Sequence, residues 1–250
     1  MIHAIIDLLN FYNFSNGYAF LTIILFAGVA YSIKAKKLTI TASITGVGLA
    51  YLIYASAGYT GILMMIAFFL MGTAATGWKL QHKLKHINAG ESKSGRRASQ
   101  VFANAGVPGM ASVVMLIYPN LANLMPLLMG AAFAAATADT LSSELGIVYG
   151  QRFFNIITLK ADKCGLDGVV SIEGTIFGAL GSALIASIYA MGFGWNVNFL
   201  LIFFAGTSGN LFDSILGATL ERKGLLGNDA VNFLNTTFAA LVALLLSVSF

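Results

Sequence analysis

Long apolar stretches separated by short polar segments dominate the chain. Runs without any Asp, Glu, Lys or Arg cover residues 8–33, 38–78, 98–138, 174–212 and 230–250. A helix needs about 20 mostly apolar residues to cross the hydrocarbon core of a bilayer, so the three longest runs can each hold two spans joined by a turn. Turn-forming residues lie near the middle of all three, at Gly58, at Pro119 and Asn120, and at Gly194.

This pattern predicts an all-α, polytopic transmembrane helical bundle that forms a single integral membrane domain over residues 1–250. The eight predicted spans lie near residues 18–33, 38–56, 60–77, 101–118, 123–149, 170–191, 197–219 and 229–249. The fifth span continues past Asp139 to about Tyr149. Residues 1–12 are expected to form a short interfacial helix.

The basic residues orient the predicted bundle. All 14 Lys and Arg residues fall within four segments, 34–37, 79–97, 152–163 and 222–223, which are alternate loops of the eight-span arrangement. Because Lys and Arg accumulate in cytoplasmic loops, this side is predicted to be cytoplasmic and both termini to lie outside. One missed span would scatter these charges over both sides, so their one-sided distribution also supports the span count.

The amino-acid composition limits the kinds of partner that the chain can be expected to bind. Apolar residues make up 58% of the chain and charged residues 10%, which excludes an ordinary soluble domain. The net charge of +4 lies in short loops beside apolar spans, so the expected partner is the lipid bilayer and not nucleic acid. The single cysteine, Cys164, rules out an internal disulfide, and the N-terminus lacks the basic flank of a cleavable signal.

Carboxylates inside the predicted spans are the first functional candidates. Asp139 and Glu144 lie in the fifth span, Asp213 in the seventh, and Asp229 opens the eighth. A charged side chain at the centre of a membrane helix costs about 2.5–3.5 kcal/mol on the insertion scale, so such residues are retained mainly for function. The sequence contains no Lys or Arg within the predicted spans to neutralise them.

Helical spacing places these acids on polar faces. Three predicted spans carry a polar stripe. The stripe of the seventh span consists of Asn210, Asp213, Gly217 and Glu221, with Ser214 at its edge. The eighth span carries Asn228, Asn232, Asn235 and Thr236, and the fifth carries Asp139, Ser142 and Ser143. Lipid would reject such faces, so the three helices are expected to face one another. Interhelical hydrogen bonding alone is the alternative explanation. Because like charges repel, we predict a bound Mg²⁺, held by Asp139, Glu144, Asp213 and Asp229.

Other segments are candidates for binding phosphate or metal. Arg96 and Arg97 precede residues 104–109, which are predicted to break the fourth span, a break that is tolerated only where it is buried or lines a cavity. A glycine-rich loop at 165–171 leads to a helix start, where free N–H groups favour phosphate; glycines 174, 178 and 181 could instead serve close helix packing. His82 and His86 could ligate a metal, but the neighbouring lysines favour a basic interfacial helix.

Four sequence blocks resemble a known membrane-protein family, called domain of unknown function ninety-two, which includes the phytyl-phosphate kinase of plant vitamin E synthesis. The blocks are RASQVFANAGVP at 97–108, AATADTLSSELG at 135–146, DGVVSIEGT at 167–175, and DSILGAT at 213–219 followed by Asn228 and Asp229. The resemblance spans about residues 75–240. Val169 stands where a second glycine is expected, and residues 160–163 replace a stretch that is proline-rich in many relatives.

The resemblance implies transfer of a phosphoryl group from a nucleoside triphosphate, CTP above all, to an isoprenyl monophosphate. Asp139, Glu144, Asp213 and Asp229 are the expected catalytic and metal-binding residues. The expected substrate-binding residues are Arg96, Arg97, Asn104, Ser143, Asp167, Gly168, Ser171, Thr175, Asn210, Ser214, Arg222, Asn228 and Asn232. Arg97 is assigned to the nucleotide and Arg222 to the lipid phosphate. The site is expected to face the cytoplasm, at the cytoplasmic membrane of a prokaryote.

Two other functions use similar parts. An ion-coupled transporter would place its site near the midplane, with access from both sides. The predicted outer half has almost no ionisable residues, which favours an interfacial enzyme. A cytidylyltransferase that forms a CDP-lipid would need the same residues as a kinase, and only its products would distinguish it.

Overall fold

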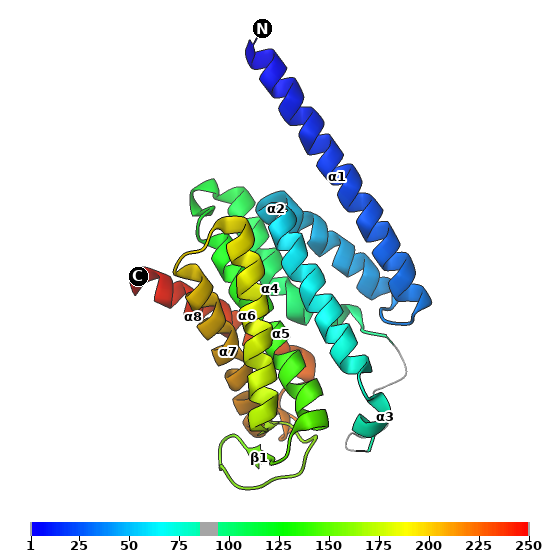
Figure 1. The fold of residues 1–250 in the computed structure, drawn as a ribbon, viewed down its shortest axis with the longest axis vertical. Coiled ribbons are helices and arrows are strands. Elements are labelled where there is room, and N and C mark those ends of the chain that lie inside the picture. The colour runs from blue at the N-terminus through cyan, green and yellow to red at the C-terminus, as the bar shows by residue number, and fades with distance from the viewer. Residues whose placement is uncertain (1, 86–94, 250) are drawn as a thin grey trace.

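The protein is a bundle of helices that run roughly along one axis (Figure 1). The computed structural model describes residues 2–85 and 95–249, and side chains from residue 16 onward. The helices are α1 (Ile2–Lys34), α2 (Ile40–Gly77), α3 (Leu80–Lys83), α4 (Ala98–Ile117), α5 (Met125–Tyr149), α6 (Ile172–Phe193), α7 (Asn198–Leu216) and α8 (Asn228–Ser249). The prediction for His86 lies outside the described residues.

Helix α2 bends back on itself within the predicted turn. Gly58 has a φ of +57° and a ψ of −149°, a conformation that a residue with a side chain rarely adopts. The two arms on either side of Gly58 run in opposite directions (Figure 1). The corner is tight, because a Cβ atom added to Gly61 would lie 2.7 Å from Ile53 Cγ2. The sequence therefore located this turn correctly.

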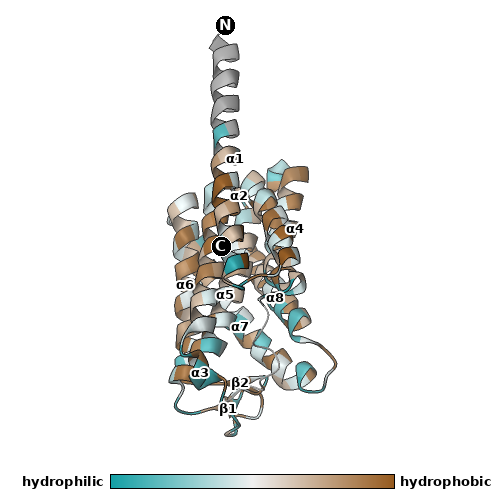
Figure 2. Ribbon diagram, turned by 90° about the vertical axis from the view of Figure 1, so that its right-hand side faces the viewer, coloured by the Kyte–Doolittle hydropathy of each residue, from teal (hydrophilic) through white to brown (hydrophobic). Residues whose placement is uncertain are grey.

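The chain is an integral, multi-pass membrane protein. Six helices of the described part are long and apolar enough to cross a membrane, and bent α2 counts once among them. Apolar residues cover the sides of the bundle, whereas hydrophilic residues gather at the end that carries α3 and the β strands (Figure 2). The count of eight spans and the side on which the termini lie stay predictions.

Helix α5 forms the centre of the bundle and contacts α2, α4, α6, α7 and α8. Almost every residue from Met125 to Ala138 is buried, and many are alanines. Small side chains allow neighbouring backbones to approach closely in a membrane protein. For example, a Cβ on Gly206 of α7 would lie 2.6 Å from Ala134 Cβ. Because neighbouring helices enclose the first part of α5, the polar residues that follow on the same helix also lie among helices.

Two predictions about helix breaks were wrong. Helix α1 is continuous over Ile2–Lys34, so the predicted short N-terminal helix is not separate from the first span, whose apolar part, Asn16–Lys34, agrees with the predicted 18–33. Helix α4 continues through Pro108, and the segment 104–109 packs inside the bundle, with residues 105–109 all buried. Proline removes one backbone hydrogen bond, but neighbouring helices hold the segment in place, and the Ser112 hydroxyl donates to the Pro108 carbonyl at 3.0 Å.

The loop between α5 and α6 contains a short hairpin that the sequence did not predict. Strand β1 (Phe154–Asn155) pairs in antiparallel register with β2 (Val169–Val170). Two-residue strands carry too little alternating hydrophobicity to be recognised from sequence. The hairpin lies at the hydrophilic end of the bundle (Figure 2) and holds the glycine-rich loop near α7.

Candidate functional site

A polar pocket lies between α5, α7, the start of α8 and the loop at 165–171. It has a volume of about 180 Å³. Its polar and ionisable lining residues are Asp139, Ser142, Ser143, Asp167, Ser171, Asn210, Asp213, Ser214, Glu221 and Asn228. Seven of the predicted substrate-binding residues line it, namely Ser143, Asp167, Gly168, Ser171, Asn210, Ser214 and Asn228. The polar stripes of α5 and α7 therefore face each other, as helical spacing had indicated.

Two carboxyl groups meet at the bottom of this pocket. Asp139 of α5 and Asp213 of α7 lie within hydrogen-bonding reach of each other. Asn235 of α8 is fully buried, and its amide donates to Asp213 Oδ2 at 3.4 Å. The Asn235 Oδ1 atom has no hydrogen-bond partner among the described residues. Asn210, also buried, lines the same cavity, so amide groups surround the pair of acids.

A π-helical turn, Gly217–Glu221, extends α7 and forms one wall of the pocket. The loop backbone packs directly against it at Gly168, which has a φ of +67°. A Cβ added to Gly168 would lie 2.2 Å from the Ala218 backbone nitrogen, so only glycine fits. Glu221 ends this turn and lines the pocket. The sequence had placed Glu221 on the Asp213 face but not among the site residues.

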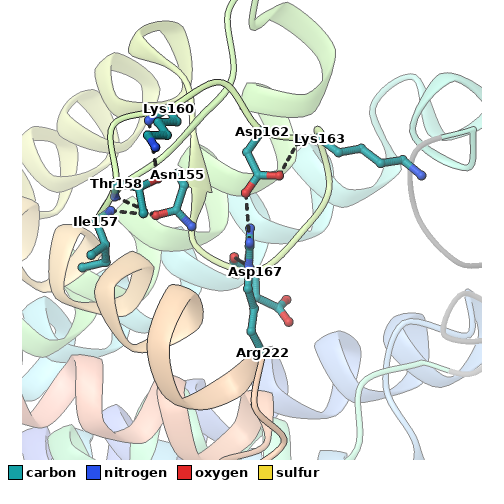
Figure 3. Close-up of polar contacts among 8 residues, drawn as sticks. All are labelled: Asn155, Ile157, Thr158, Lys160, Asp162, Lys163, Asp167 and Arg222. Carbon is teal, nitrogen blue, oxygen red and sulfur yellow. Dashed lines mark hydrogen bonds and ion pairs between the residues drawn. The ribbon is translucent and has the colours of Figure 1, made fainter.

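Arg222 anchors the loop that covers the pocket (Figure 3). Its Nε donates to the Asp167 carbonyl at 2.5 Å, and its Nη1 lies 2.9 Å from Asp162 Oδ2. The Lys163 backbone N–H and the Arg222 guanidinium hold the pKa of Asp162 below its usual value. The same loop is shaped by Asn155, whose Oδ1 accepts from two backbone N–H groups. The contact of Arg222 with a lipid phosphate stays a prediction; in this structure Arg222 holds protein groups.

Glu144 forms an ion pair with a lysine inside the bundle, where no cation was predicted. The Lys83 ammonium, on short helix α3, forms an ion pair with Glu144 Oε2. It also donates to the Ala75 and Thr76 carbonyls at 2.8 and 2.7 Å, and Lys83 is only 1% exposed. The premise that every intramembrane acid lacks a protein cation was therefore wrong for Glu144. Helix α3 folds back under the end of α2, which periodicity along the chain could not indicate.

The two arginines before α4 lie away from the pocket lining. The Arg96 guanidinium lies 5.7 Å from the ring centroids of both Phe68 and Phe69. Burial lowers the pKa of Arg96, and the charge of Glu144 opposes this shift. Arg97 is exposed at the start of α4, where its backbone N–H donates to the Gln100 side chain at 2.9 Å. Their assignment to substrate phosphates stays a prediction.

The remaining predicted residues have local partners. The Asn104 amide donates to the Gln100 carbonyl, the Thr175 hydroxyl to the Ser171 carbonyl, and the Asn232 amide to Asn228 Oδ1. These three, together with Asp229 in the first turn of α8, are not among the pocket-lining residues.

The α6 glycines serve close helix packing, the alternative that the sequence had left open. A Cβ on Gly174 would lie 2.7 Å from the Ser142 carbonyl, and one on Gly178 would lie 2.8 Å from the Ala138 carbonyl. The backbone of α6 can therefore lie directly against α5. Ser171 caps α6 by accepting from the Gly174 N–H at 3.1 Å while it also lines the pocket.

The donor set of the pocket suits a hard cation better than a bare anion. Four lining residues carry carboxylates, and none of the described lining residues is Lys or Arg. Within the described part of the chain, no three His, Cys, Asp or Glu residues are grouped to hold a metal, so the predicted four-carboxylate set is not assembled. Mg²⁺, however, usually takes one or two carboxylates and completes its shell with waters and substrate phosphates. Asp139 and Asp213 fit that smaller requirement.

The fold and the pocket define a polytopic helical membrane protein with an acidic, polar site at one end of the bundle. The chain belongs to the integral membrane protein DUF92 family, whose sequence pattern matches residues 22–240. The match begins closer to the N-terminus than the predicted core of 75–240.

Three relatives illustrate the range of this family. An uncharacterized membrane protein of Methanocaldococcus jannaschii is 30% identical over 91% of this chain and 93% of its own length. The chloroplastic protein VTE6 of Arabidopsis thaliana is 30% identical over 82% of this chain, which spans 65% of VTE6. An uncharacterized membrane protein of a Synechocystis strain is 34% identical over 78% of this chain and 77% of its own. No solved structure shows a significant match.

Proposed function

We propose that this protein is a prenyl-phosphate kinase of the membrane, which transfers the γ-phosphoryl group of a nucleoside triphosphate, CTP in our proposal, to an isoprenyl monophosphate. The observation that carries the proposal is the pairing of Asp139 and Asp213 in a polar pocket at the hydrophilic end of a membrane bundle. The four sequence blocks that resemble a family with a phytyl-phosphate kinase among its members support a kinase-type role. A lipid phosphate presents its head at this level while its chain stays in the bilayer.

The reaction asks little of the protein beyond positioning and charge neutralisation. The acceptor phosphate is already an anion, so its oxygen can attack the γ-phosphorus without a strong base, and the nucleoside diphosphate leaves. Mg²⁺ held by Asp139 and Asp213 would neutralise phosphate charge in the otherwise acidic pocket. Asn210, Ser214 and Asn228 would orient phosphate oxygens through their polar side chains.

The covering loop completes the proposed site. Residues 165–171 line the pocket, and in our proposal backbone N–H groups of this loop donate to phosphate oxygens. Arg222 keeps this loop in place through Asp162 and the Asp167 carbonyl. In our proposal Arg222 therefore acts as a positioning residue for the loop, and the site opens to the cytoplasm of a prokaryotic cell, the side where the basic loops lie.

Product analysis with the purified protein tests the proposal. The protein in nanodiscs is incubated with geranylgeranyl or phytyl monophosphate, Mg²⁺ and each nucleoside triphosphate in turn. We expect a prenyl diphosphate and a nucleoside diphosphate. Release of pyrophosphate with a CDP-lipid would identify a cytidylyltransferase, and the absence of any lipid product with all four nucleotides would refute enzymatic transfer to these acceptors.

Variants connect the activity to the pocket. Asp139→Asn and Asp213→Asn should each lower turnover by at least about 10²-fold, the typical effect of removing one preorganised charge-stabilising group. Glu173→Gln, a change in the first turn of α6 outside the pocket lining, is the matched control and should retain turnover. Near-normal turnover of both aspartate variants would remove the acidic pair from the mechanism.

A further inference from the structure

An apolar groove lies on another side of the bundle, between the last turns of α2 and α5 and the second turn of α6. It has a volume of about 370 Å³, within the range of about 300–1,000 Å³ that is usual for small-molecule sites. Met71 and Ala74 of α2, Leu141 and Leu145 of α5, and Phe177 of α6 line it. Because these residues lie at the ends of membrane helices, the groove can receive a hydrocarbon chain from the bilayer.

The end of the groove carries aromatic rings and a cation. Trp78 Nε1 donates to the Tyr149 hydroxyl at 2.9 Å, and both residues line the groove. The Lys79 ammonium lies 5.0 Å from the Tyr149 ring centroid. Lys79 also has a φ of +45°, a left-handed conformation that is uncommon for residues with side chains. Trp and Tyr are typical of the membrane interface, and a lysine there attracts anionic headgroups.

The groove is separate from the polar pocket, because the two sites lie against different sides of α5. The glycine edge of α6 closes against the pocket side of α5, where Gly178 contacts Ser142 and Asn210. Phe177, which lies about 100° around α6 from Gly178, faces the groove. On α5, Leu141 lies about 160° around the helix from Asp139, at about 100° per residue. A lipid chain in the groove would therefore not lead its phosphate to the acidic pair.

We propose that the groove is a binding site for an anionic bilayer lipid, with one hydrocarbon chain along Leu141 and Leu145 and the phosphate headgroup at Lys79. The shape and apolar lining select a chain, and the charge of Lys79 selects the anionic headgroup. This inference does not depend on the proposed kinase activity, because it concerns different residues on a different side of α5.

The two tryptophans of the chain provide a direct assay. Trp195→Phe leaves Trp78 in the groove as the fluorescent reporter, while Trp78→Phe leaves Trp195, which lies between α6 and α7, as the matched control. The full-length protein is reconstituted in vesicles that contain lipids with brominated chains, which quench nearby tryptophan. Brominated phosphatidylglycerol is compared with brominated phosphatidylcholine at equal mole fractions.

We expect phosphatidylglycerol to bind beside Trp78 about fivefold more strongly than phosphatidylcholine, the equivalent of about 1 kcal/mol for one lysine near the interface. Trp195 should show no such preference. Lys79→Gln should abolish the preference at Trp78, whereas Lys223→Gln, a change of another exposed lysine, should leave it intact. Ala74→Phe, which fills the groove from an exposed position, should reduce quenching by both lipids.

Three results would overturn the proposal. Equal quenching of Trp78 by both lipids would show that the groove does not select a headgroup. A preference that survives in Lys79→Gln would place the selecting charge elsewhere. If Ala74→Phe raised the KM for a prenyl monophosphate but left lipid quenching unchanged, the groove would belong to the substrate chain and not to a bilayer lipid.

Discussion

Removal of the Lys83 ammonium is expected to destabilise the bundle more than the loss of any exposed charge. The ammonium is buried and has three partners, the Glu144 carboxylate and the carbonyls of Ala75 and Thr76 at the end of α2. Lys83→Met keeps an apolar chain of similar length but leaves the carboxylate and both carbonyls without this donor. Breaking a buried ion pair by removing one partner typically costs about 3–5 kcal/mol.

The charge of Arg96 places the expected destabilisation of Lys83→Met at the lower end of that range. This charge interacts with Glu144, so the carboxylate keeps one favourable neighbour after Lys83 is lost. We therefore expect a loss of about 3 kcal/mol in the free energy of unfolding for Lys83→Met. Glu144→Gln alone should cost less, about 1–3 kcal/mol, because the amide oxygen can still accept from Lys83 and the two helix-end carbonyls remain bonded.

A double-mutant cycle measures the pair directly. Unfolding of the purified protein by a denaturing detergent is followed for Lys83→Met, Glu144→Gln and the combination, with exposed Lys85→Met as the control. The double variant should be more stable than the sum of the single losses predicts, since no buried charge is left without a partner. A Lys83→Met variant as stable as Lys85→Met, or strictly additive losses, would contradict the ion pair.

Three further predictions concern the loop and the topology. Burial raises the pKa of the Cys164 thiol, so alkylation of Cys164 should be slow at pH 7 and faster as the pH rises. Arg222→Ala should speed this alkylation several-fold by releasing the loop, and an unchanged rate would mean that Arg222 does not anchor the loop. The Gly168→Ala variant should be about 1–3 kcal/mol less stable than the wild type in a thermal melt, because Gly168 has a positive φ and the π-helical turn leaves no space for a Cβ atom. Wild-type stability of this variant would refute the close packing of Gly168 against the turn. In a background without Cys164, a cysteine at Asn120 should react with an impermeant reagent outside intact cells and one at Lys160 should not; the reverse pattern would invert the orientation.

Local pattern was enough to predict the class of fold and much of the pocket. Apolar runs of span length identified a helical membrane protein, and Gly58 marked the turn within α2, because only glycine readily adopts its conformation. The 3.6-residue period placed Asp139 and Asp213 on polar faces that had to be buried together, and these two acids do meet. Periodicity determines the direction in which a side chain leaves its helix, and lipid forces polar faces inward.

Tertiary structure alone decided which groups each polar side chain meets. Lys83 reaches Glu144 because α3 folds back beneath α2, and Arg222 reaches Asp162 across the covering loop. Neither contact follows from spacing along the chain, since the partners are brought together by packing between separate elements. The same holds for Pro108, which neighbouring helices keep within a continuous α4. The sequence by itself thus determined the membrane helices and their polar faces, whereas only the packing of the bundle decided which carboxylates line the pocket and which are neutralised by a lysine.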